Sequence, residues 1–115
     1  MSNFLANRLG VTGWLSLAIF LMQCSAPPEK RMPKTDTVEI KGMRFQPDRL
    51  TIQPGDSVIW INHDLVDHDI TSTGGESWNS GPLHPGKSWS RIFPGGAEYY
   101  CSIHPVMKGK LVTGP

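Results

Sequence analysis

The feature that most constrains the fold of this 115-residue chain is a short segment near its C-terminus, Cys101 to Met107. It places a thiol, the imidazole of His104 and a thioether at the spacing C-x-x-H-x-x-M. Pro105 lies inside the segment and cannot continue a helix, because it lacks an amide N–H and restricts the residue before it. The three side chains are therefore expected to converge on a tight loop that follows a β-strand.

These three side chains match the ligand preferences of copper. Thiolate and thioether sulfur are soft donors, and imidazole suits copper as well as zinc. Each residue alone would more often be structural, since Cys and Met commonly fill cores, and a Cys–His pair can also be a nucleophile with its base or part of a zinc site. Together they favour one copper ion bound by Cys101, His104 and a distant axial Met107, and they disfavour zinc, for which Met is a poor ligand.

Such a site needs a fourth ligand, which is expected to be a histidine from elsewhere in the chain. His68 is the best candidate, because His68 and Ile70 are expected to share the inward face of one strand. His63 is its rival and follows Asn62 at the end of an apolar run. His63 and His84 are otherwise expected to be ordinary surface histidines.

Composition limits the chain to one small domain and excludes several classes of function. The formal net charge is +1, and Lys and Arg are scattered, so no nucleic-acid surface is indicated. Ten Pro and twelve Gly separate short apolar runs, which favours an all-β fold. If Cys101 binds metal, Cys24 has no partner for a disulfide. Four protein ligands would leave no open position on the metal, so we do not expect an enzyme.

The N-terminal third is expected to lie outside the folded domain. Residues 1–24 are predicted to be an export signal, with a positive charge at Arg8 and an apolar stretch over 11–22 that is too short to span a membrane comfortably. Residues 25–36 are rich in Pro and charge and predict a semi-extended tether. We therefore expect an exported protein, in the periplasm or on the outer face of a membrane.

The end of the export signal has two interpretations. The sequence Leu-Met-Gln-Cys that ends at Cys24 resembles a bacterial lipoprotein box, in which the Cys is lipidated and tethers the protein to a membrane. Gln23 departs from that pattern, which has a small residue before the Cys. Cleavage after Ala26 or an uncleaved anchor are the alternatives.

Residues 37–115 are predicted to form a series of short strands. Val38 and Ile40 alternate toward the core, residues 57–61 are apolar on both faces and predict a central strand, and Tyr99 and Cys101 share one face. Gly and Pro turns separate the runs. Seven to eight such strands predict a Greek-key β-sandwich.

The segment from Tyr99 to Val112 resembles the C-terminal copper loop of the cupredoxins, nearest to the amicyanins and bacterial plastocyanin-like proteins. The resemblance extends to residues 55–62, 68–70 and 80–86, so that it covers the chain from about Thr37 to its end. It implies a cupredoxin sandwich with one type 1 copper ion. The cupredoxin pattern places the first histidine ligand six residues after the Asn, which selects His68 over His63.

The resemblance favours a monomeric carrier of single electrons over the alternative, a protein for copper delivery or sequestration, because a rigid Cys-His-His-Met site releases metal poorly. His104 is expected to be the exposed ligand and the exit for the electron. Redox protein partners are expected to dock on an apolar surface around it, formed by Leu65, Val66, Pro82, Leu83, Pro105 and Val106.

The chain departs from the cupredoxin pattern at Asp69, where Asn is frequent. In the family that Asn ties its strand to the loop after the Cys. A hydrogen bond between Asp69 and Ser102 is the expected replacement here, with Asp69 turned away from the metal by the alternation of the strand.

Overall fold

The computed structural model of this chain describes residues 10, 13, 16–23, 25–27 and 29–115. These fall into two compact units, Met1–Lys30 and Arg31–Pro115. The described residues of the first unit form neither helix nor strand. Nowhere in the described part of the chain is there a helix with the length and apolarity to cross a membrane. Arg8 and Cys24, on which the export and lipidation predictions depend, lie outside the described residues.

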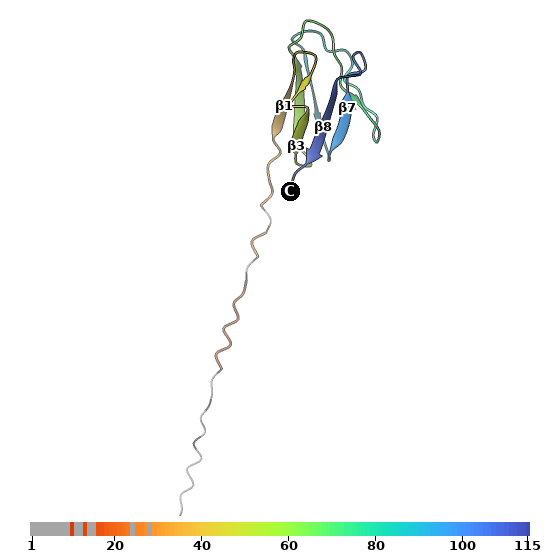
Figure 1. The fold of residues 1–115 in the computed structure, drawn as a ribbon. Coiled ribbons are helices and arrows are strands. Elements are labelled where there is room, and N and C mark those ends of the chain that lie inside the picture. The colour runs from red at the N-terminus through yellow and green to blue at the C-terminus, as the bar shows by residue number, and fades with distance from the viewer. Residues whose placement is uncertain (1–9, 11–12, 14–15, 24, 28) are drawn as a thin grey trace, which may run out of the picture. The chain divides into compact units, whose positions relative to one another are not determined.

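The second unit is an all-β sandwich of two four-stranded sheets (Figure 1), which confirms the predicted fold class. One sheet has the strand order β2-β1-β4-β6 and the other β3-β8-β7-β5. The pairs β1–β4 and β3–β8 are parallel, and the remaining pairs are antiparallel. The strands are β1 (Thr35–Ile40), β2 (Phe45–Gln46), β3 (Arg49–Ile52), β4 (Ser57–Asn62), β5 (Thr71–Ser72), β6 (Ser88–Ile92), β7 (Ala97–Tyr100) and β8 (Lys108–Thr113).

Burial alternates along the strands as the sequence pattern predicts. Val38 and Ile40 of β1 are fully buried, as are alternate residues of β4, which lies between β1 and β6 and is the expected central strand. Tyr99 and Cys101 are both buried, at 1% and 0% exposure, so the shared face is confirmed. The first strand begins at Thr35, two residues earlier than expected.

Aromatic rings fill the space between the sheets. The ring of Trp60 lies 5.2 Å from that of Tyr99 and 5.8 Å from that of Phe93, both at steep angles typical of edge-to-face packing. Burial raises the pKa of Tyr99 to about 12. Gly109 on β8 lies directly under this tyrosine, and a Cβ there would come within 2.2 Å of its ring. The core therefore needs glycine at this position for steric reasons.

The topology places two loops at one end of the sandwich. Strand β4 ends at Asn62, β7 ends at Tyr100, and β8 begins at Lys108. Because β7 and β8 are antiparallel neighbours, the loop that joins them lies at one end of the sandwich. Strand β8 runs from that end to the C-terminus, which lies at the other end (Figure 1). We call the end with the β7–β8 loop the copper end.

The opposite end is held by a buried carboxylate. Asp56 directly precedes β4 and accepts hydrogen bonds of 2.8 and 3.0 Å from the guanidinium of Arg31, and others from the backbone N–H groups of Lys34 and Gln53. The hydrogen bonds from Arg31 hold the pKa of Asp56 far below its usual range, although burial acts in the opposite direction. Arg31 and Lys34, expected in a tether, thus contact the sandwich.

Candidate metal centre

Three of the predicted ligands come together at the copper end. The Sγ atom of Cys101 lies 3.8 Å from Nδ1 of His68 and 4.0 Å from Nδ1 of His104. The three donor atoms lie within 4.8 Å of one another. Metal bonds of about 2.0 Å to nitrogen and 2.3 Å to sulfur span at most about 4.3 Å between two donors of one ion. Both sulfur–nitrogen distances meet that limit, so one ion can bind the thiolate and both imidazoles.

The predicted loop between β7 and β8 carries the other ligands. Its ends are joined by a hydrogen bond of 3.0 Å from Cys101 N to Met107 O, and Met107 N donates to His104 O at the same distance. Cys101 and Met107 are buried, whereas His104 is only half-buried. The loop therefore directs two sulfur side chains inward and leaves one imidazole near the surface, as expected for His104.

His68 is held from the other side of the site by the backbone. Its N–H and C=O both bond to Leu83, at 3.1 and 2.7 Å, and its side chain is fully buried. The strand expected here is shorter than predicted, because β5 contains only Thr71–Ser72 and His68 forms an isolated bridge. His68 and Ile70 are both buried as expected, but Asp69 between them is also buried, at 6% exposure.

The second nitrogen of the His68 ring has a carboxylate partner that the sequence analysis missed. Nε2 lies 2.9 Å from Asp64, which also accepts hydrogen bonds from the backbone N–H groups of Gly42 and Met43 at 2.7 and 2.9 Å. Burial acts to raise the pKa of Asp64, but the bonds from Met43, His68 and Gly42 outweigh it and hold the pKa below its usual value. An ionised Asp64 keeps the proton on Nε2 and leaves Nδ1 free to bind metal.

Asp69 makes the contact predicted for it. Its carboxylate accepts hydrogen bonds from the backbone N–H of Ser102 at 2.6 Å, from the Ser102 hydroxyl, and from the Thr71 hydroxyl at 3.1 Å. Its own backbone N–H points at the sulfur of Cys101, 3.4 Å away. The residue therefore ties the segment of His68 to the loop of Cys101, and it supplies a hydrogen-bond donor to the thiolate.

The other two histidines do not join the donor cluster. His63 is exposed, with Nε2 3.8 Å from Glu39, and His84 is exposed, with Nδ1 2.8 Å from Asp67. Both are therefore surface histidines, as expected. Asn62 supports the loop between β4 and His68 instead, by donating from Nδ2 to Val66 O and Leu83 O.

The expected apolar surface is present in part. Leu65, Val66 and Val106 are exposed, at 93%, 45% and 88%. Leu83 was assigned to this surface wrongly, because the backbone pairing with His68 turns its side chain into the core, where it is 6% exposed. Ile103, which was not predicted, is 46% exposed on the copper loop. We define the copper-end patch as Leu65, Val66, Ile103 and Val106.

Residues 33–114 match the family described as copper binding proteins of the plastocyanin/azurin family. The chain belongs to this family. It is 36% identical over 82 residues to amicyanin-alpha of Methylorubrum extorquens, covering 66% of this chain and 69% of that protein, and 32% identical to amicyanin of Paracoccus denitrificans, covering 66% and 63%.

Solved structures of cupredoxins have the same fold as this one. A purple cupredoxin from Nitrosopumilus maritimus superposes with a TM-score of 0.63 at 29% identity, covering 69% of this chain and 99% of that one. A copper(I) amicyanin variant gives a TM-score of 0.65 at 26% identity, covering 70% and 82%. The cluster of one thiol and two imidazoles, with the buried thioether of Met107 on the same loop as Cys101, suits one type 1 copper ion.

Proposed function

We propose that this cupredoxin carries single electrons between redox proteins, with one type 1 copper ion held by His68, Cys101, His104 and Met107. The observation that carries the proposal is the buried Cys101 sulfur, placed 3.8 and 4.0 Å from the two Nδ1 atoms. Bound copper would supply a one-electron cycle between its +2 and +1 states. The four side chains leave no position for a substrate, so the protein is a carrier and not an enzyme.

The residues around the ligands keep the site in one geometry. The ring of His68 is held by Asp64, and the backbone of His68 is held by two hydrogen bonds with the backbone of Leu83. The copper loop is closed by its own hydrogen bonds and is tied by Asp69 to the segment of His68. Electron transfer is fast when the ligands move little between the two oxidation states, and this support serves that requirement. The N–H of Asp69 also stabilises the thiolate and thereby tunes the potential.

His104 is the proposed exit for the electron. It is the only one of the three clustered donors that is not fully buried, and it belongs to the same loop as Ile103 and Val106 of the copper-end patch. An exposed apolar surface of this kind suits brief docking of a redox protein partner. The protein is proposed to act as a monomer that presents this end to its partners.

The test of the function is the spectrum and voltammetry of the copper-loaded protein. An intense visible band from thiolate-to-copper charge transfer, with reversible voltammetry and fast self-exchange, is the expected result. Tight copper binding with sluggish electron transfer would support copper delivery or sequestration instead. A colourless copper(II) protein would overturn both the electron-carrier function and the type 1 assignment.

The choice of His68 as the first histidine ligand has its own matched pair of variants. His68→Ala should lose the native spectrum, because one of the two equatorial imidazoles is removed. His63→Ala should keep it, because that exposed side chain only approaches Glu39. The opposite pattern would exchange the two roles.

We also propose that residues 1–24 direct export, that the segment from residue 25 to the start of the sandwich links the signal to the domain, and that Cys24 is lipidated. These proposals rest on the apolar stretch over 11–22 and the sequence that ends in Cys24. Mass spectrometry of the N-terminal peptide from the membrane fraction should show a lipid on Cys24, and Cys24→Ser should release the protein. An unmodified peptide that begins after Ala26 would point to cleavage as a soluble periplasmic protein.

A further inference from the structure

Four aromatic rings form a row that begins on β7, the strand that leads into the metal centre, and extends toward the surface. Tyr99 lies two residues before Cys101, and both are buried. Its ring is 5.2 Å from that of Trp60, which is 5.5 Å from that of Trp89, and Trp89 in turn stacks on Trp78 at 5.8 Å and 26°. Each pair of adjacent rings thus lies within the centroid separation of about 4.5–7 Å that is typical of interacting aromatic pairs. We call these four residues the aromatic row.

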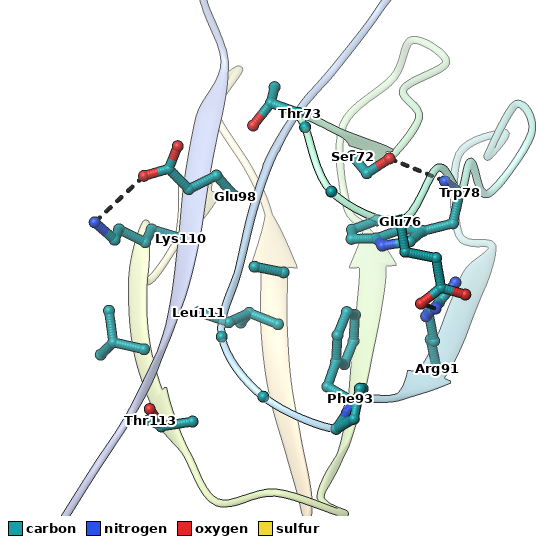
Figure 2. A pocket seen from close by; sticks show the side chains of 17 residues that line it. Ser72, Thr73, Glu76, Trp78, Arg91, Phe93, Glu98, Lys110, Leu111 and Thr113 are labelled. Carbon is teal, nitrogen blue, oxygen red and sulfur yellow. Dashed lines mark hydrogen bonds and ion pairs between the residues drawn. The ribbon is translucent and has the colours of Figure 1, made fainter.

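The outer end of the row opens into a groove. Trp78 and Phe93 line a cavity of about 650 Å³ between the edges of the two sheets, together with Arg91 and Glu76 (Figure 2). Trp78 is half-buried, and its backbone N–H is fixed by a hydrogen bond of 2.9 Å to the Ser72 hydroxyl. A small oxidant in this groove can therefore reach an indole ring without entering the core.

The charges in the groove give the row a direction. The guanidinium of Arg91 lies 5.2 Å from the centre of the Trp78 ring and is paired with Glu76 at 2.8 Å. A cation over an aromatic ring stabilises the neutral ring and opposes the loss of an electron from it. Glu76 offsets this only in part, because its side chain is 70% exposed and its charge is screened by water. Electron loss is therefore easier from the inner rings than from Trp78.

An oxidised tryptophan is trapped as a neutral radical only when its indole proton can pass to an acceptor. Trp60 is fully buried, and among residues 29–115 its Nε1 has no hydrogen-bond partner that could accept the proton. An oxidised Trp60 therefore keeps its proton and stays a strong oxidant until an electron reaches it. The aromatic row thus has closely packed rings, inner rings that lose an electron more easily than Trp78, and a buried Trp60 whose Nε1 has no hydrogen-bond partner among residues 29–115.

We propose that the aromatic row is a second electron route, which returns an electron from the reduced metal centre to Trp78 when a strong one-electron oxidant attacks the groove. The proposal rests on the proposed copper function. The oxidant gains one electron from Trp78, Trp89 then supplies an electron to Trp78, and Trp60 supplies one to Trp89. Bound copper(I) would supply the electron to Trp60 by tunnelling through Tyr99 and Cys101, without oxidation of Tyr99, and would become copper(II). No bond breaks and no proton moves. The metal centre is oxidised by one electron, and the indole ring of Trp78 stays chemically intact.

The test compares Trp78 damage in two metal forms of the full chain. Ruthenium(III) tris-bipyridine, generated by light with persulfate, is the oxidant, and mass spectrometry of the digest measures oxygen added to Trp78. Copper(I) protein should show several-fold less damage at Trp78 than protein loaded with redox-inert zinc(II). Equal damage in the two forms would overturn the proposal.

A break in the row separates this route from direct attack on the metal. Trp89→Phe keeps an aromatic ring of lower volume but removes the readily oxidised link, so Trp78 should lose its protection by copper(I). Tyr100→Phe is the matched control beside Cys101 and should keep the protection. Undiminished protection in Trp89→Phe, or its loss in Tyr100→Phe alone, would show that the electron bypasses the row.

Two further measurements keep the result interpretable. The circular dichroism and the copper(II) charge-transfer band of Trp89→Phe show whether the variant is folded and loaded, and Trp89→Leu is a second variant that should give the same loss of protection. If the wild-type protein lacks the charge-transfer band, the proposed copper function is wrong. If the wild type and Trp89→Phe are both blue and copper(I) protects Trp78 equally in both, only the aromatic-row proposal is wrong.

Discussion

Carboxylates with little or no solvent exposure hold the chain together at both ends of the sandwich, but their charge is cancelled at only one end. Asp56, at the end opposite the copper, accepts two hydrogen bonds from the guanidinium of Arg31. Asp64 and Asp69, at the copper end, accept theirs from backbone N–H groups, hydroxyls and the ring of His68. Within residues 29–115, neither of these two has a Lys or Arg as an ion-pair partner.

We therefore expect the charge of Asp56 to affect only stability, and the charges of Asp64 and Asp69 to affect the reduction potential of the metal. At the far end, the pair of Asp56 and Arg31 is locally neutral and fixes only the start of β4. At the copper end, a copper(II)–thiolate unit would carry a net positive charge of one, and it loses that charge on reduction. Uncancelled carboxylates beside it favour the oxidised state and so lower the potential. The two ends therefore should respond differently to the same Asp→Asn substitution.

The largest effect is expected from removal of the thiolate itself. Cys101→Ala should abolish the visible band completely, because the band arises from the Cys–copper bond. Met107→Leu is the control on the same loop and should keep the band while raising the potential, since the thioether is a weak donor that stabilises copper(II). Absorption spectroscopy decides the outcome, and a blue Cys101→Ala protein would contradict the ligand set.

Asp56→Asn should lower the melting temperature of the copper protein by several degrees and leave its potential unchanged. The substitution removes charge-assisted hydrogen bonds to Arg31 and leaves that cation unpaired. Because folding lowers the pKa of Asp56, its stabilisation is fully present above the unfolded value near 3.9 and is lost as the pH falls toward the folded value.

The difference in melting temperature between wild type and Asp56→Asn should therefore shrink below about pH 4. Calorimetry at a series of pH values measures it. Two results would contradict the proposed difference between the two ends. One is a difference in melting temperature that does not change with pH, and the other is a shift in the potential of Asp56→Asn as large as that of the copper-end variants.

Asp69→Asn should raise the potential with little change in the melting temperature. The amide can still accept hydrogen bonds from Ser102, but the negative charge near the thiolate is gone. For one unit charge in a partly screened site, the expected change is some tens of millivolts. Voltammetry of the two proteins at one pH is the measurement, and an unchanged potential would mean that Asp69 has only a structural role.

Asp64→Asn is expected to raise the potential by less than Asp69→Asn does. The Asp64 side chain is 14% exposed, so water screens its charge better than that of Asp69, which is 6% exposed as a whole residue. The amide oxygen can still accept a hydrogen bond from His68, so the visible band should persist. A shift larger than that of Asp69→Asn would place the stronger electrostatic influence on the imidazole side of the metal.

The sequence predicted the parts of the site that depend on ligand chemistry and spacing. The C-x-x-H-x-x-M loop, the inward His68 and the contact between Asp69 and Ser102 follow from residue type, alternation and the resemblance. Asp64 was missed because a carboxylate four residues before a histidine is a common pattern, and its role depends on a turn more than 20 residues upstream. Arg31 was missed because a Pro- and charge-rich segment gives no sign of one specific buried partner.

The turn at Gly42 and Met43 bears on when the metal site can form during folding. These residues donate to Asp64, which orients His68, and His68 faces a sulfur 33 positions further along the chain. The site is therefore complete only after β1 pairs with β4 and the loop of Cys101 packs against the segment of His68 and Asp69. Both contacts join distant parts of the chain and are expected to form slowly. Copper that binds this completed arrangement stabilises the whole domain by mass action. Retention of the metal thus reports on the integrity of the entire sandwich, from its first turn to its final strand.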